Sequence, residues 1–98
     1  VVLAGEFGRA PRFNAMGGRD HWGHVFSIAL AGAGLKQGYV HGASDRIGAY
    51  PTEGRVVPED LIATMFHLLG HSPQTSLKDM QGRPFGLAEG EVIRSILT

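Results

Sequence analysis

The sequence contains no cysteine and has no excess of charge of either sign. Without cysteine there are no disulfides, no thiol catalysis and no cysteine-bound zinc, so any metal must be held by His, Asp or Glu. Nine basic residues balance nine acidic ones and no run of five like charges occurs, which argues against nucleic acid and anionic membranes as partners. No segment approaches the ~20 apolar residues of a membrane span, so we expect no membrane-spanning helix.

The length of 98 residues suits one modest domain or a piece of one. The chain opens on Val1-Val2-Leu3-Ala4, which is typical of a strand and lacks the basic-then-apolar layout of a signal peptide. We therefore expect residues 1–98 to be an incomplete domain. The 15 glycines lie mostly between apolar runs, which predicts many tight turns.

Three segments are predicted to form strands. The first, residues 1–4, should end near Glu6, and residues 39–42 could form a short edge strand. Residues 24–31 are apolar nearly throughout, which is typical of a strand covered on both faces in a parallel sheet. The predicted fold class is therefore α/β, with residues 24–31 as a central strand.

The clearest helix is predicted to begin at Pro58 and to end before Gly70. Proline is tolerated in the first turn, Glu59 and Asp60 place negative charge at the positive end of the helix, and Gly70 can take the left-handed cap. Apolar residues at three- and four-residue spacing predict a stripe that packs against a sheet or another helix: Leu61, Ile62, Met65, Phe66, Leu68 and Leu69. Residues 91–97 form a smaller amphipathic patch that suits one helical turn or an edge strand.

The best functional clue is a carboxylate, Glu6, at the predicted end of a strand, followed in the next loop by the pair Asp20-His21. Sheet proteins often gather hard-metal ligands at strand ends. Glu6 could instead be a solvated carboxylate or an ion-pair partner of Arg9, and His21 a hydrogen-bonded loop residue. Asp20 could bind metal or orient the His21 ring.

Two arginines flank these residues, and their roles are also open. Arg9 and Arg19 could bind the oxygens of a sulfate or phosphate group in bidentate fashion. They could equally brace the loops by donating to backbone carbonyls.

His67 and His71 have the spacing of zinc-binding helices, but Gly70 interrupts the helix between them.

Several motifs carry a family resemblance. They are Glu6-Phe7-Gly8-Arg9-Ala10-Pro11, Gly18-Arg19-Asp20-His21-Trp22, residues 26–38, residues 57–70 and Gln81-Gly82-Arg83-Pro84. Together they resemble the carboxy-terminal part of an uncharacterised, sulfatase-like bacterial family, which is similar to the alkaline phosphatase and sulfatase superfamily. The resemblance covers almost the whole chain.

The resemblance implies an alkaline-phosphatase-like, mainly parallel sheet with packed helices, and a two-metal centre. Glu6 and His21 occupy the places of metal ligands, with divalent zinc, calcium or magnesium as the cofactor. Relatives usually have Asp-His where this chain has Glu6-Phe7, so one imidazole is missing. The nucleophile would lie upstream of Val1, the substrate would be a sulfate or phosphate ester, and relatives are often exported.

These observations predict part of a metal-dependent ester hydrolase that is inactive when isolated. The alternative is a non-catalytic module in which the same loops bind a partner chain or support the sheet. A sheet with an exposed edge strand tends to cover that edge by self-association. We expect a homo-oligomer under either hypothesis.

Overall fold

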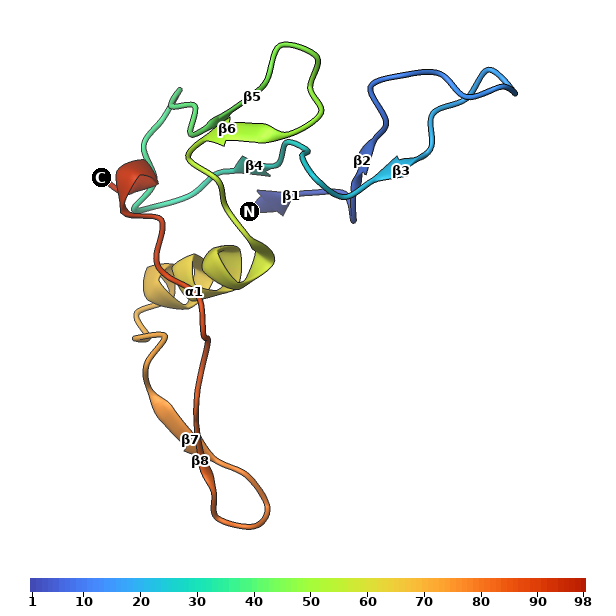
Figure 1. Ribbon diagram of the computed structural model, residues 1–98. Coiled ribbons are helices and arrows are strands. Elements are labelled where there is room, and N and C mark those ends of the chain that lie inside the picture. The colour runs from blue at the N-terminus through green and yellow to red at the C-terminus, as the bar shows by residue number, and fades with distance from the viewer. The chain divides into compact units, whose positions relative to one another are not determined.

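The computed structural model describes all of residues 1–98, which form eight short β-strands, one α-helix and one 3₁₀ helix (Figure 1). By their internal contacts the residues divide into a first unit, Val1–Arg55, and a second unit, Val56–Thr98. Each unit is described separately below.

The first unit consists of three antiparallel strand pairs. Strand β1 (Val2–Leu3) pairs with β4 (Ala29–Leu30), β2 (Gly8–Arg9) pairs with β3 (His21–Trp22), and β5 (Ala43–Ser44) pairs with β6 (Pro51–Glu53). The registers place Val2 opposite Leu30 and Gly8 opposite Trp22. The β5–β6 pair contains a register shift after Ala43.

The predicted α/β fold class, a mainly parallel sheet of the alkaline-phosphatase type, is wrong for this chain. All four strand pairs are antiparallel and each pair forms a sheet of its own. Parallel neighbours require a crossover of a dozen or more residues, usually a helix. The single α-helix lies after the first six strands, so no helical crossover joins any of them. Glycine-rich turns favour hairpins, in which neighbouring strands are antiparallel.

The individual strand predictions succeed only in part. Strand β1 lies within the predicted segment 1–4, but both of its residues are exposed. Within residues 24–31 only Ala29–Leu30 is a strand, and Phe26 is 43% exposed, so the predicted buried central strand is absent. Residues 39–42 are not a strand, since β5 begins at Ala43. An apolar run indicates a tendency to be buried but does not specify a pairing partner.

The predicted helix is confirmed as α1 (Pro58–Leu68), with Leu69 as its C-terminal cap residue. At its N-terminus the Asp60 carboxylate accepts a hydrogen bond from the Val57 amide at 3.1 Å. At its C-terminus Gly70 has φ +89°, and the amides of Gly70 and His71 donate to the carbonyls of His67 and Phe66. This is the Schellman arrangement, in which a left-handed glycine turns the chain away from the helix.

The predicted apolar stripe of α1 is not the most buried face of the helix. The fully buried residues are Ala63 and Thr64, whereas Ile62 is 44% exposed and Leu69 is 72% exposed. Small side chains are buried here because another segment, residues 88–93, runs close along the helix (Figure 1). Periodicity therefore located the helix correctly but not its contact face.

Side-chain oxygens of α1 hold this returning segment. Asp60 accepts from the Glu91 amide at 3.0 Å, and the Thr64 hydroxyl accepts from the Ile93 amide at 2.9 Å while donating to the Asp60 carbonyl at 2.7 Å. A Cβ atom on Gly90 would overlap the carbonyl group of Glu59, so only glycine fits at this crossing. The segment then enters the 3₁₀ helix Arg94–Ile96, which is the helical turn that residues 91–97 allowed.

A β-hairpin extends away from α1 in the second unit (Figure 1). Its strands are β7 (Ser76–Lys78) and β8 (Pro84–Gly86). In the turn, the backbone amides of Arg83 and Gln81 and the Arg83 guanidinium donate to the Asp79 carboxylate. These bonds, the Arg83 amide first, hold the pKa of Asp79 below its ordinary value of 3.8.

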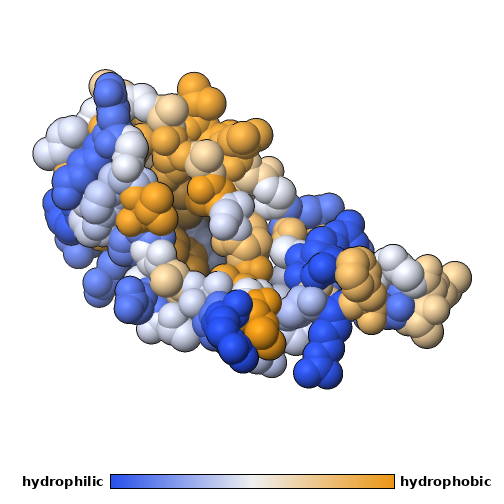
Figure 2. All heavy atoms as spheres, turned by 90° about the horizontal axis from the view of Figure 1, so that it is seen from above, coloured by the Kyte–Doolittle hydropathy of each residue, from blue (hydrophilic) through white to orange (hydrophobic).

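Little apolar surface is buried in either unit. The buried side chains are Ala10, Ala49, Ala63 and Thr64, and the accessible surface is 7612 Å². Two separate compact bodies of half the 10.5 kDa mass would expose about 6,500 Å² together. Apolar residues accordingly lie at the surface among polar ones (Figure 2).

Replacing Asp60 with alanine should destabilise the second unit by about 1–3 kcal/mol, because both the helix start and the Glu91 amide lose an acceptor. The midpoint of urea unfolding measures this loss. Glu59→Ala is the matched control, since it removes an exposed acidic residue from the same helical turn and should cost at most about 1 kcal/mol. Equal shifts of the two midpoints would contradict the clamping role of Asp60.

Candidate functional site

The β2–β3 pair brings together the two sequence motifs that flank the loop of residues 10–20. Gly8 lies opposite Trp22 and Arg9 lies opposite His21, and the Ala10 amide donates to the Asp20 carbonyl at 2.9 Å. A Cβ atom on Gly8 would overlap the Val25 carbonyl oxygen, so the motif needs glycine for the following chain to pass. The Glu-Phe-Gly-Arg and Gly-Arg-Asp-His-Trp motifs are thus neighbours in space.

His21 begins strand β3 and is exposed. Its ring stacks on Phe7, with 4.0 Å between the centroids and a tilt of 33°. The guanidinium of Arg9 lies 5.4 Å from the centroid of the same phenyl ring. Phe7 therefore contacts both His21, the candidate metal-binding residue, and Arg9, the candidate anion-binding residue.

Glu6 lies at a bend that precedes β2 and its side chain is exposed. Its carboxylate forms no ion pair with Arg9. The chain has a single salt bridge, which joins Arg83 and Asp79. The structure contains no group of three or more His, Asp or Glu side chains that could hold a metal ion. The metal-binding roles of Glu6, His21 and Asp20 stay predictions.

Asp20 has a partner that the sequence reasoning missed. The Asn14 amide nitrogen donates to the Asp20 carboxylate at 3.0 Å, and the Asn14 side-chain oxygen accepts from the amides of Met16 and Gly18 at 3.0 and 2.9 Å. Asparagine commonly closes a turn in this way, and the following Gly17-Gly18 pair is the sequence signal that could have identified it. The loop thereby fixes the carboxylate next to His21.

Both candidate arginines donate to backbone carbonyls of this loop. Arg19 donates to the carbonyls of Ala10 and Pro11 at 3.0 and 2.9 Å and lies over the Phe13 ring at 4.3 Å. Arg9 donates to the Arg19 carbonyl at 3.3 Å. Arg19 therefore uses one guanidinium nitrogen to make both bonds to the loop, whereas Arg9 makes a single long bond and keeps most of its donors available.

Trp22 joins the hairpin to the rest of the first unit. Its indole N–H donates to the Ala49 carbonyl at 2.7 Å, and its ring contacts His24 and Tyr50 at centroid distances of 4.8 and 5.8 Å. The ring centroids of His24 and Tyr50 are 4.9 Å apart. The hydrogen bond and the ring contact of Trp22 therefore connect strand β3 to residues 49 and 50.

The chain thus combines antiparallel strand pairs and one helix with a strand pair, β2–β3, that carries both motifs. Residues 1–97 match the family DUF1501, whose description is a protein of unknown function, and the chain belongs to this family. Comparisons with curated proteins and with solved structures found no match.

Helix α1 has 11 residues and rises about 16 Å. No helix in the structure has the length and apolar character needed to cross a bilayer.

Replacing Asn14 with alanine should release the loop of residues 10–20, because three hydrogen bonds are lost. The NMR order parameters of residues 14–18 should fall from about 0.85 to below about 0.6. Arg12→Ala, an exposed change in the same loop, should leave them unchanged. Unchanged order parameters in the Asn14 variant would show that the arginines alone hold the loop.

Proposed function

We propose that this chain is the carboxy-terminal portion of a metal-dependent ester hydrolase of the sulfatase or phosphatase type. It would contribute metal ligands, while the nucleophile would come from elsewhere. One observation carries the proposal: the β2–β3 hairpin brings the Glu6 motif and the His21 motif to one place, although they are fifteen positions apart. The resemblance of these motifs to the alkaline phosphatase and sulfatase superfamily supports it.

The donor types fit a divalent metal. His21 offers an imidazole and Glu6 a carboxylate, and both side chains are exposed. Two such donors are fewer than the three protein ligands of a catalytic zinc site, so the complete site would need more ligands. Bound metal would supply Lewis-acid stabilisation of the oxygens at the reacting phosphorus or sulfur.

The surrounding residues have definable roles in this proposal. Phe7 would hold the His21 ring by stacking, and Asp20, itself held by Asn14, would bind metal or orient the ring. Arg9 would contact the sulfate or phosphate group of the substrate, because its guanidinium has donors to spare. Arg19 would act by bracing the loop.

Replacing His21 with alanine should weaken the affinity for metal at least about tenfold. Loss of even a residue that contacts the metal indirectly commonly has that effect. Equilibrium dialysis against zinc, magnesium or calcium, followed by elemental analysis, measures the metal held. His71→Ala is the control, because His71 is exposed and lies in the other unit. Equal metal in all three proteins would remove His21 from the site.

A second candidate function, a self-associating module, is favoured by the surface of the first unit. The two-stranded β1–β4 sheet has an unpaired edge on each side, and Val1 and Leu3 are 93% and 73% exposed. Unpaired strand edges with apolar side chains are templates for pairing with another chain. We propose a homo-oligomer formed through this sheet.

The mass measured by light scattering should therefore rise with protein concentration. Leu3→Lys should return the chain to the monomer mass, because charge on an edge strand opposes pairing. Met80→Lys, an equally drastic change at a fully exposed site outside this sheet, should not. A monomeric wild-type chain at high concentration would exclude the self-associating module.

A further inference from the structure

The second unit contains a cleft of about 480 Å³ that the candidate site does not use. It is formed by His67 near the end of α1, by the turn of residues 72–74, by residues 90–92 and by Arg94. Small-molecule sites have volumes of about 300–1,000 Å³. The cleft is thus large enough for a small organic molecule.

The walls of the cleft are fixed by hydrogen bonds. The Glu91 and Ile93 amides are bound to Asp60 and Thr64 of α1, so residues 90–93 are anchored to the helix. The Ala88 amide donates to the Pro73 carbonyl at 2.9 Å, which ties the same segment to the turn after the helix. These bonds hold the cleft walls to α1 and to the turn that follows it.

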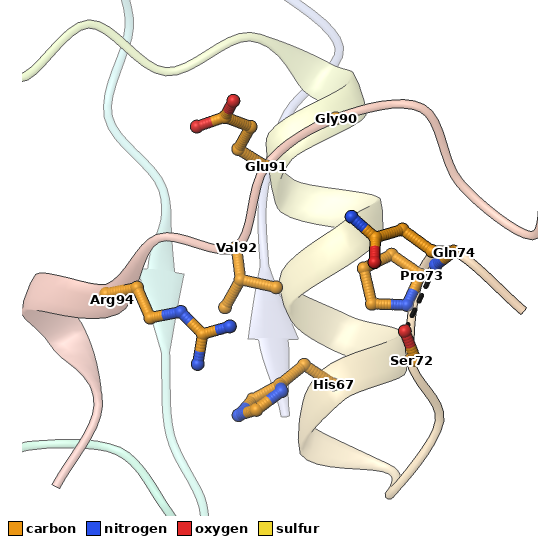
Figure 3. Close-up of a pocket in the computed structure, with 8 residues that line it drawn as sticks. All are labelled: His67, Ser72, Pro73, Gln74, Gly90, Glu91, Val92 and Arg94. Atoms are coloured by element: carbon orange, nitrogen blue, oxygen red, sulfur yellow. Dashed lines mark hydrogen bonds between the residues drawn. The ribbon is translucent and has the colours of Figure 1, made fainter.

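Two of the polar side chains in the cleft have no partner within the protein, whereas the Ser72 hydroxyl accepts a hydrogen bond from the Gln74 amide at 3.3 Å. Figure 3 shows the Arg94 guanidinium and the His67 imidazole pointing toward one another, with the Val92 side chain directed between them. Neither group makes a side-chain hydrogen bond, and neither forms a salt bridge, since the chain's ion pair is Arg83–Asp79. The Glu91 carboxylate points away from both (Figure 3).

The chemistry of these groups identifies the kind of ligand. A guanidinium presents five donors in a planar fork that matches carboxylate or phosphate oxygens, and an imidazole supplies a further donor. Val92 and Pro73 add apolar surface beside them, and Ser72 adds a hydroxyl. A single imidazole with a carboxylate directed elsewhere does not suit a metal.

We propose that this cleft binds a small organic anion, with its oxyanion group on Arg94 and His67 and its apolar part against Val92 and Pro73. The site lies wholly in the second unit and involves neither Glu6 nor His21. It therefore stands independently of the proposed metal site. The ligand class comprises carboxylates and phosphate esters of small carbon skeletons.

NMR titration of the ¹⁵N-labelled chain tests the proposal, with benzoate, phenyl phosphate and inorganic phosphate as probes. Binding of benzoate or phenyl phosphate should shift the amide signals of His67, Val92 and Arg94. Inorganic phosphate should bind more weakly, because it offers nothing to the apolar wall. The absence of shifts with both organic probes would overturn the proposal, as would equally tight binding of inorganic phosphate.

Substitutions locate the binding in the cleft. Arg94→Met, which keeps the apolar stem but removes the charge, should weaken binding of the organic probes at least about tenfold. His67→Leu should also weaken it and provides the test if the Arg94 variant is not folded, which the spectrum of the free protein reveals. Arg46→Met removes an exposed arginine from the first unit and should have no effect. Equal affinities for wild type and a folded Arg94→Met or His67→Leu variant would overturn the assignment.

Discussion

Hydrogen bonds at the turns and crossings fix the path of the chain, which fully buries only a few side chains. In the second unit the constraint is concentrated at Thr64 and Asp60, which together accept the amides of the returning segment. The Thr64 hydroxyl is fully buried and satisfied in both directions, as donor and acceptor. A buried hydroxyl left without partners would cost about 1–3 kcal/mol, so this pairing also selects one path for the segment.

The same principle organises the first unit around polar side chains in loops. Asn14 and Arg19 close the loop between β2 and β3, and Asp45 accepts the amides of Ala49 and Tyr50 in the β5–β6 turn. The bonds of Asn14 and Arg19 position the two motifs without a large core. They also explain why the hairpin can present His21 and Arg9 at the surface.

The helix could be predicted from the sequence, because its signals are local, whereas the pairing of distant strands could not. Pro58, Asp60 and Gly70 act within a few residues of their own position, and the helix that they predicted is present. The direction of strand pairing depends on connections along the whole chain, so the apolar run at residues 24–31 was misread as a buried strand of a parallel sheet. The proximity of the Glu6 and His21 motifs was expected, but its basis, a hairpin closed by Asn14, was not.

The hairpin formed by β7 and β8 has a further consequence. Met80 lies in its turn, fully exposed, and the Asp79 carboxylate fixes the neighbouring backbone. Since the sequence has no cysteine, Met80→Cys would introduce a single thiol on a well-defined turn. A spin label or fluorophore attached there would report distances to the first unit, which would establish how the two units are arranged in solution.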